Sequence, residues 1–107
     1  ILKKQPEAAI INISSRSGVT TPAGQSIYVA SKWGVTGFTE VLKNDLKETK
    51  VRVAGVYQGG TNTKMFEKTG ENFPVNTFID PKNLADVVVF MLSRPGQIWL
   101  HDVRVEY

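Results

Sequence analysis

Apolar runs with two different periods divide the chain into predicted strands and helices. Residues 8–14 are apolar except for Asn12 and the closing serine, which is the pattern of a strand buried in a parallel sheet. Residues 51–57 form a second run rich in β-branched side chains, and this run breaks at two glycines. Between the two runs, residues 27–46 repeat apolar side chains at helical spacing. We therefore expect a strand-helix-strand unit with a right-handed crossover.

The second half of the chain predicts one more helix and one more strand. Asp80 and Pro81 form a helix start, because aspartate caps a helix well and proline suits the first helical position. Residues 98–107 alternate between apolar and polar sides, as in a half-exposed edge strand. Residues 61–79 are mostly polar and are expected to form a lid or binding loop. The predicted fold class is α/β, with three parallel strands in the order β-α-β-α-β.

The long helix of residues 27–46 carries two kinds of surface. Four apolar residues are spaced for a face on the core: Val35, Phe38, Leu42 and Leu46. The first half has small residues instead, namely Ala30, Ser31, Gly34 and Gly37. Glycines inside a helix cost about 1 kcal/mol each, so close packing of another helix should compensate. The alternative is that this small face lies on the chain's own sheet.

Composition narrows the class of protein. A chain of 107 residues is one domain at most, and the absence of cysteine excludes disulfides and thiolate metal sites and suits the cytoplasm. The net charge of +3 comes from scattered lysines, which argues against a nucleic-acid partner. No apolar run is long enough to span a membrane, and no pattern indicates a metal site. Because the sequence begins with isoleucine, we expect it to be a piece of a longer protein.

Tyr28 and Lys32 are the first candidates for chemistry. Residues four apart share one face of a helix, so the phenol and the ammonium should occupy one site. A nearby cation and the positive end of a helix both favour the ionised form of a phenol, which suits acid/base work. The spacing alone is weak, since nine lysines give any tyrosine about a one-in-twelve chance of such a partner. Taken alone, Tyr28 fits an aromatic residue packed on the core better than a catalytic tyrosine.

Two further segments are expected beside this pair. Ser14 and Ser15 directly follow the first predicted strand, and Gly59 and Gly60 follow the second. Ligands of open parallel sheets bind at the carboxyl ends of the strands. The helix that begins near Tyr28 starts close to the same edge. These residues should therefore converge on one edge of the sheet.

Three motifs together resemble the C-terminal half of the short-chain dehydrogenase/reductase family. They are residues 12–15 (NISS), 28–32 (YVASK) and 59–63 (GGTNT) followed by Met65. In that family a serine lies thirteen residues before the tyrosine and three before a glycine, and Ser15 and Gly18 match this register. The resemblance extends over the whole chain and implies part of a doubly wound, Rossmann-type sheet.

The resemblance implies a role for each matching residue. Tyr28 is similar to the proton donor or acceptor at the substrate oxygen, and Ser15 to the residue that holds the substrate carbonyl or hydroxyl. Lys32 is similar to the lysine that activates the tyrosine and binds the nicotinamide ribose. Tyr28 would also contact the cofactor, and the remaining cofactor-binding residues would be Gly59, Thr61 and Thr63. The family's usual proline before this glycine is replaced by Gln58, which casts doubt on the local backbone.

The resemblance also implies partners and an incomplete cofactor site. The cofactor would be NAD or NADP, the substrate a small carbonyl or alcohol compound, and the assembly a homo-oligomer, either a dimer or a tetramer. Residues 1–107 would be the catalytic half of one domain, without the glycine-rich turn that holds the pyrophosphate. This piece alone is therefore expected to bind a dinucleotide poorly and to be inactive. The alternative is a non-catalytic remnant or interaction module.

Overall fold

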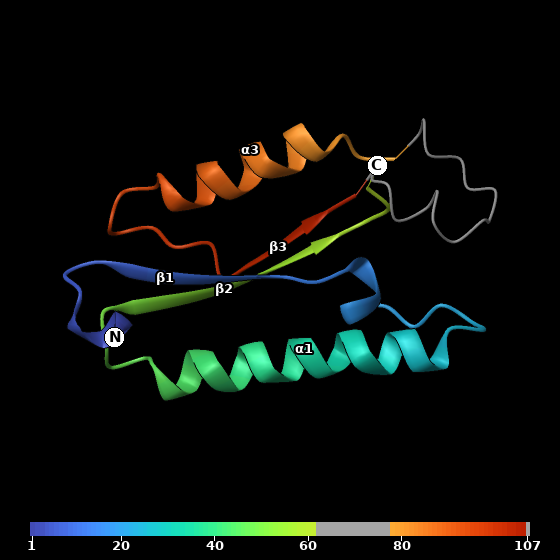
Figure 1. Cartoon of the computed structure of the whole chain (residues 1–107), viewed down its shortest axis with the longest axis horizontal. Coiled ribbons are helices and arrows are strands. Elements are labelled where there is room, and N and C mark those ends of the chain that lie inside the picture. The colour runs from blue at the N-terminus through green and yellow to red at the C-terminus, as the bar shows by residue number, and fades with distance from the viewer. Residues whose placement is uncertain (62–77, 107) are drawn as a thin grey trace.

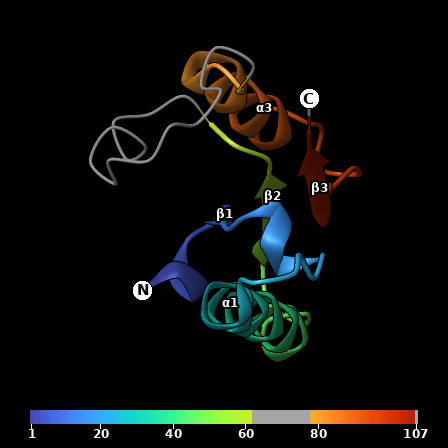
Figure 2. The ribbon, with the colours of Figure 1, turned by 90° about the vertical axis from the view of Figure 1, so that its right-hand side faces the viewer.

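A sheet of three parallel strands lies at the centre of the structure, a computed structural model that describes residues 1–61 and 78–106 (Figure 1). Strand β1 (Ala8–Ile13) pairs with β2 (Val51–Gln58), and β2 pairs with β3 (Asp102–Val105). Helix α1 (Ser26–Asp45) lies on one face of the sheet and α3 (Pro81–Leu92) on the other (Figure 2). The predicted α/β class and the three parallel strands are confirmed.

The core forms around β2 because this strand lies between the two others and is covered on both faces. Two residues of β2, Ala54 and Val56, and one of α3, Met91, are almost fully buried and make up the centre of the core. Asp80 caps α3 as the sequence predicts, since its carboxylate accepts a hydrogen bond from the Lys82 amide at 2.9 Å. The helix therefore starts where its apolar residues can reach the sheet.

The face of α1 that packs on the sheet differs from the predicted one at Phe38. This side chain is 63% exposed, whereas Thr39 is 1% exposed and faces the sheet. The Thr39 hydroxyl donates to the Val35 carbonyl at 2.7 Å and accepts from Asn12 Nδ2 of β1 at 2.9 Å. A threonine whose hydroxyl is paired in this way is stable in a core. The prediction for Phe38 was wrong because it considered only apolar residues as core candidates.

The last strand is shorter than the predicted 98–107 and covers only Asp102–Val105. Just before it, the Trp99 indole Nε1 donates to the Val53 carbonyl at 2.9 Å. The Trp99 side chain thus bonds to a β2 carbonyl that would accept a backbone hydrogen bond if the last strand were longer. The described part of the strand is an edge strand of alternating exposure, as predicted.

An ion pair links the edge strand to α1. Lys43 Nζ lies 2.8 Å from Asp102 Oδ1 and 2.8 Å from Glu40 Oε1. Burial lowers the pKa of Lys43. The hydrogen bonds to Asp102 and Glu40 together raise it by more than burial lowers it, so the net pKa lies above its ordinary value. Lys43 therefore stays charged and holds β3 against the helix.

The carboxyl ends of β1 and β2 and the start of α1 lie at the same end of the molecule (Figure 1). A short 3-10 helix, η2 (Arg16–Gly18), follows β1 there and packs against α1. Thr61 and Ile79 also lie close together, because they form a β-bridge and the Ile79 amide donates to the Gly60 carbonyl at 2.8 Å. Residues 62–77, most of the lid or binding loop predicted over 61–79, lie outside the described residues. Among the described residues, no helix is long and apolar enough to cross a membrane.

Candidate active site

Ser15 lies at the carboxyl end of β1, where the chain turns into η2. Its backbone is extended and its Oγ accepts a hydrogen bond from the Ser17 amide at 3.1 Å. Ser15 is thus a capping serine. Capping uses only a lone pair of the hydroxyl oxygen, so the proton remains available for an acceptor such as a substrate oxygen.

Tyr28 and Lys32 lie on the first two turns of α1. Lys32 Nζ is 5.5 Å from the centroid of the Tyr28 ring, within the range of a cation-π contact. By helical spacing both side chains lie on the same side of α1 as Val35 and Thr39, which face the sheet. The helix extends past the carboxyl ends of the strands at this point, so Tyr28 remains 44% exposed (Figure 1). Tyr28 is therefore not packed in the core.

Thr36 ties the turn of α1 that carries Lys32 to η2. Its Oγ1 lies 2.7 Å from the Gly18 carbonyl and 3.1 Å from the Lys32 carbonyl, both of which accept hydrogen bonds from it. A Cβ atom on Gly18 would lie only 2.8 Å from Thr36 Oγ1 and 3.2 Å from the Lys32 carbonyl oxygen. Glycine is therefore needed for this close approach. The contact fixes the turn after Ser15 relative to Lys32, and the sequence analysis did not identify Thr36.

The residues after β2 complete the edge. Gly59 is buried and its amide donates to the Val105 carbonyl at 2.7 Å, and the Thr61 hydroxyl donates to the Gly59 carbonyl at 3.2 Å. Gln58 ends β2 in ordinary register opposite Val105, so the replaced proline does not disturb the backbone. Thr63 lies outside the described residues.

The structure brings five of the six expected site residues to one end of the sheet, the end that faces the viewer in Figure 2. They are Ser15, Tyr28, Lys32, Gly59 and Thr61. Ser15 and Gly59 follow adjacent strands, while Tyr28 and Lys32 approach from α1. This arrangement can hold a ligand between the helix start and the strand ends, with a hydroxyl, a phenol and an ammonium around it.

Tyr57 is the other tyrosine that the structure describes, and it suits acid/base chemistry poorly. It is 3% exposed and lies between β2 and α1. Burial raises the pKa of Tyr57, and the negative charge of Asp102 raises it further. Burial also keeps the Tyr57 phenol away from a substrate, which leaves Tyr28 as the candidate.

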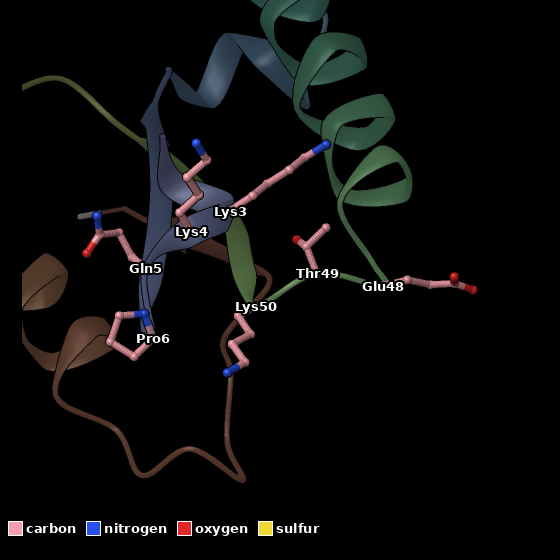
Figure 3. A pocket seen from close by; sticks show the side chains of 7 residues that line it. All are labelled: Lys3, Lys4, Gln5, Pro6, Glu48, Thr49 and Lys50. Carbon is pink, nitrogen blue, oxygen red and sulfur yellow. The ribbon is translucent and has the colours of Figure 1, made fainter.

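A surface hollow of about 530 Å³ lies at the opposite end of the sheet. It is lined by Lys3, Lys4, Gln5, Pro6, Glu48, Thr49 and Lys50 (Figure 3). The side chains of Lys4 and Lys50 point in opposite directions, and Glu48 points away from the hollow (Figure 3). These charges do not converge on a ligand. In the part of the chain that the structure describes, no group of three or more histidine or acidic residues could hold a metal ion.

The family model described as short chain dehydrogenase matches residues 1–73. The chain belongs to this family. A 3-oxoacyl-[acyl-carrier-protein] reductase from Bos taurus is 35% identical over 97 residues, which cover 86% of this chain and 41% of the relative. The chain thus spans less than half the length of this relative.

Solved structures of short-chain dehydrogenases share the fold. A betaketoacyl-[ACP] reductase from Bacteroides thetaiotaomicron is 27% identical with a TM-score of 0.79, over 99% of this chain and 43% of that chain. The closed form of a serine dehydrogenase complexed with NADP+ is also 27% identical, with a TM-score of 0.76 over 91% of this chain and 43% of that one. The Rossmann-type fold expected from the sequence is confirmed.

Proposed function

We propose that this chain is the catalytic half of an NAD(P)-dependent oxidoreductase that interconverts a carbonyl and an alcohol. The observation that carries the proposal is the Tyr28 and Lys32 pair on α1, a helix that starts at the same end of the sheet as the turn that carries Ser15. A bound nicotinamide supplies or accepts the hydride in such chemistry. The reductase names of the relatives and the NADP+ complex of the serine dehydrogenase agree with this function.

Each side chain has a distinct task in the proposed reaction. The Tyr28 phenol donates a proton to the substrate oxygen during reduction and takes one from the alcohol during oxidation. The Ser15 hydroxyl donates a hydrogen bond to the same oxygen. The Lys32 ammonium stabilises the phenolate that Tyr28 becomes, and it donates to the ribose of the cofactor.

The strand end of β2 suits the nicotinamide end of a dinucleotide. Gly59 lets the backbone approach a flat ring closely, and Thr61 and Thr63 follow with hydroxyl groups. The Gln58 side-chain oxygen is buried without a hydrogen-bond donor, so it is an unused acceptor at the end of β2. We propose that residues 1–107 belong to a longer cytoplasmic protein in which a preceding segment holds the pyrophosphate, and that this segment is required for activity.

Turnover by the complete protein tests this function. We expect NADH or NADPH to be oxidised in the presence of a small carbonyl compound. The oxidation is measured as the loss of the near-ultraviolet absorbance of the reduced nicotinamide. Residues 1–107 alone serve as the comparison and should bind neither dinucleotide measurably. A complete protein that binds neither dinucleotide would instead indicate an interaction module.

We further propose that a second copy of the chain covers the outer face of α1. Ile27, Phe38 and Val41 are 87%, 63% and 58% exposed on that side. Cβ atoms on Gly34 or Gly37 would meet nothing within 4 Å, so this small face points away from the chain's own sheet. An apolar face with glycines in its middle suits a helix that approaches closely, and in a two-fold dimer the face would meet itself.

Replacing Gly34 with leucine should weaken this association. The added side chain would hold the two helices apart, at a cost of about 1–3 kcal/mol, which corresponds to roughly a ten- to hundredfold higher dissociation constant. Sedimentation of the complete protein should show folded monomers. Asn83→Leu, at an exposed position of α3, is the matched control and should leave the assembly intact. Gly34→Leu protein that remains oligomeric would show that this face is not the interface.

A further inference from the structure

We propose that Gln58 recognises the carboxamide of the bound nicotinamide, with its side-chain oxygen Oε1 accepting a hydrogen bond from the carboxamide NH₂ group. The inference rests on the proposed function and adds a residue that determines the fit of the cofactor. It concerns a position at which this chain differs from the proline that is usual in the family.

The starting observation is a buried acceptor without a donor. Among the described residues, only two side-chain atoms are buried without a hydrogen-bond partner, Gln58 Oε1 and Ser14 Oγ. Leaving such a group unpaired costs about 1–3 kcal/mol, so a native site generally supplies a partner. Ser14 Oγ lies 3.1 Å from the position of a Cβ on Gly18, which places it beneath η2. Gln58 instead ends β2 at the candidate site.

The strand alternation places Gln58 on the side away from the catalytic pair. Tyr57 lines the same hollow as Thr36 of α1, so its side chain lies on the α1 face of the sheet. Neighbouring residues of a strand point to opposite faces, so Gln58 lies on the α3 face. Tyr28 lies on α1 and Ser15 at the turn that α1 packs against. If the substrate binds to Tyr28 and Ser15, Gln58 is on the opposite side of the strand ends, where it can contact the nicotinamide and not the substrate.

The chemistry of the two partners is complementary. An amide oxygen is a neutral acceptor, and the nicotinamide carboxamide carries two N–H donors next to one carbonyl. Gly59, the next residue, has no side chain to hold the ring away from the end of β2. A proline at position 58 would offer no side-chain acceptor. This chain should therefore depend on the carboxamide NH₂ more strongly than a protein with proline there.

Cofactor analogues provide a test by binding alone. In the complete protein, we would measure by calorimetry the dissociation constants of whichever oxidised dinucleotide binds more tightly and of its 3-acetylpyridine and thionicotinamide analogues. The acetylpyridine analogue replaces NH₂ with methyl, whereas the thio analogue keeps NH₂. We expect the wild-type protein to bind the acetylpyridine analogue about five- to tenfold more weakly than the natural dinucleotide.

Two variants decide whether Gln58 is the cause. Gln58→Met keeps the length of the side chain without its acceptor, and Gln58→Pro places the family's usual residue there. Both variants should bind the natural dinucleotide and the acetylpyridine analogue about equally. The ratio of the dissociation constant of the thio analogue to that of the natural dinucleotide should be the same in the variants as in the wild type. Far-ultraviolet circular dichroism would confirm that the variants are folded.

Three outcomes would overturn the inference. An acetylpyridine preference that is the same in the wild type and in both folded variants would show that other groups recognise the carboxamide. A change confined to the thio analogue would mean that Gln58 donates to the carboxamide carbonyl instead of accepting. A wild-type protein that binds none of the dinucleotides would remove the proposed function as well.

Discussion

Replacing Tyr28 with phenylalanine should reduce turnover of the complete protein by about 10²–10⁴-fold or more, with cofactor affinity almost unchanged. The ring remains in place, so its packing and its contact with Lys32 persist, but the proton that must move to or from the substrate oxygen is lost. Steady-state kinetics and cofactor titration of the same preparation would separate the two effects.

Tyr57→Phe is the matched control for this experiment. It removes the same hydroxyl group from a tyrosine that is 3% exposed and lies between β2 and α1. Its turnover should fall far less than that of Tyr28→Phe at a temperature where both proteins are folded, because the Tyr57 hydroxyl lies beside Thr36 and is not proposed to touch the substrate. Tyr28→Phe protein that retained more than about a tenth of the wild-type turnover would contradict a proton-transfer role, since general acid/base groups contribute at least about a hundredfold.

Replacing Lys32 with alanine should reduce both turnover and cofactor affinity. The change removes the charge that stabilises the Tyr28 phenolate and also a donor to the ribose. A hydrogen bond from a charged group contributes about 1.5–3 kcal/mol, so the dissociation constant of the cofactor should rise roughly ten- to hundredfold. Isothermal calorimetry would measure the affinity and initial rates the turnover.

Lys47→Ala is the control for the loss of one positive charge, because Lys47 is exposed beyond the C-terminal end of α1 and far from the site (Figure 1). It should alter neither quantity. A Lys32→Ala variant with wild-type cofactor affinity would show that the lysine does not touch the ribose, even if its turnover falls.

Local patterns predicted most of the fold because they reflect burial directly. The two apolar runs became β1 and β2, and the helix expected over 27–46 is Ser26–Asp45. The errors arose where a side-chain hydrogen bond changed the outcome. Thr39 entered the core through its bond to Asn12, and the Trp99 indole bonded to β2 where a longer last strand was expected. Such pairings join residues far apart in the sequence, and periodicity does not reveal them.

The candidate site was predictable to a different extent at each residue. Helical spacing placed Tyr28 and Lys32 on one side of α1, and the strand ends placed Ser15 and Gly59 at the same end of the sheet. Thr36 was not predicted, because its function depends on the approach of the Gly18 carbonyl across the interface between η2 and α1. A glycine shortly after a strand end, facing a hydroxyl residue one turn beyond the lysine, is the signal that would have indicated it.

A crystal structure of the complete protein with oxidised cofactor and an unreactive substrate analogue tests the central claim most directly. The claim is that Tyr28, Lys32 and Ser15 surround the reacting atoms. We predict that the Tyr28 hydroxyl lies within hydrogen-bond reach of the analogue's oxygen, at about 2.6–3.2 Å, with Ser15 Oγ on the same atom and Lys32 Nζ on the nicotinamide ribose. A nicotinamide bound elsewhere, or a Tyr28 hydroxyl turned away from the analogue, would contradict the account.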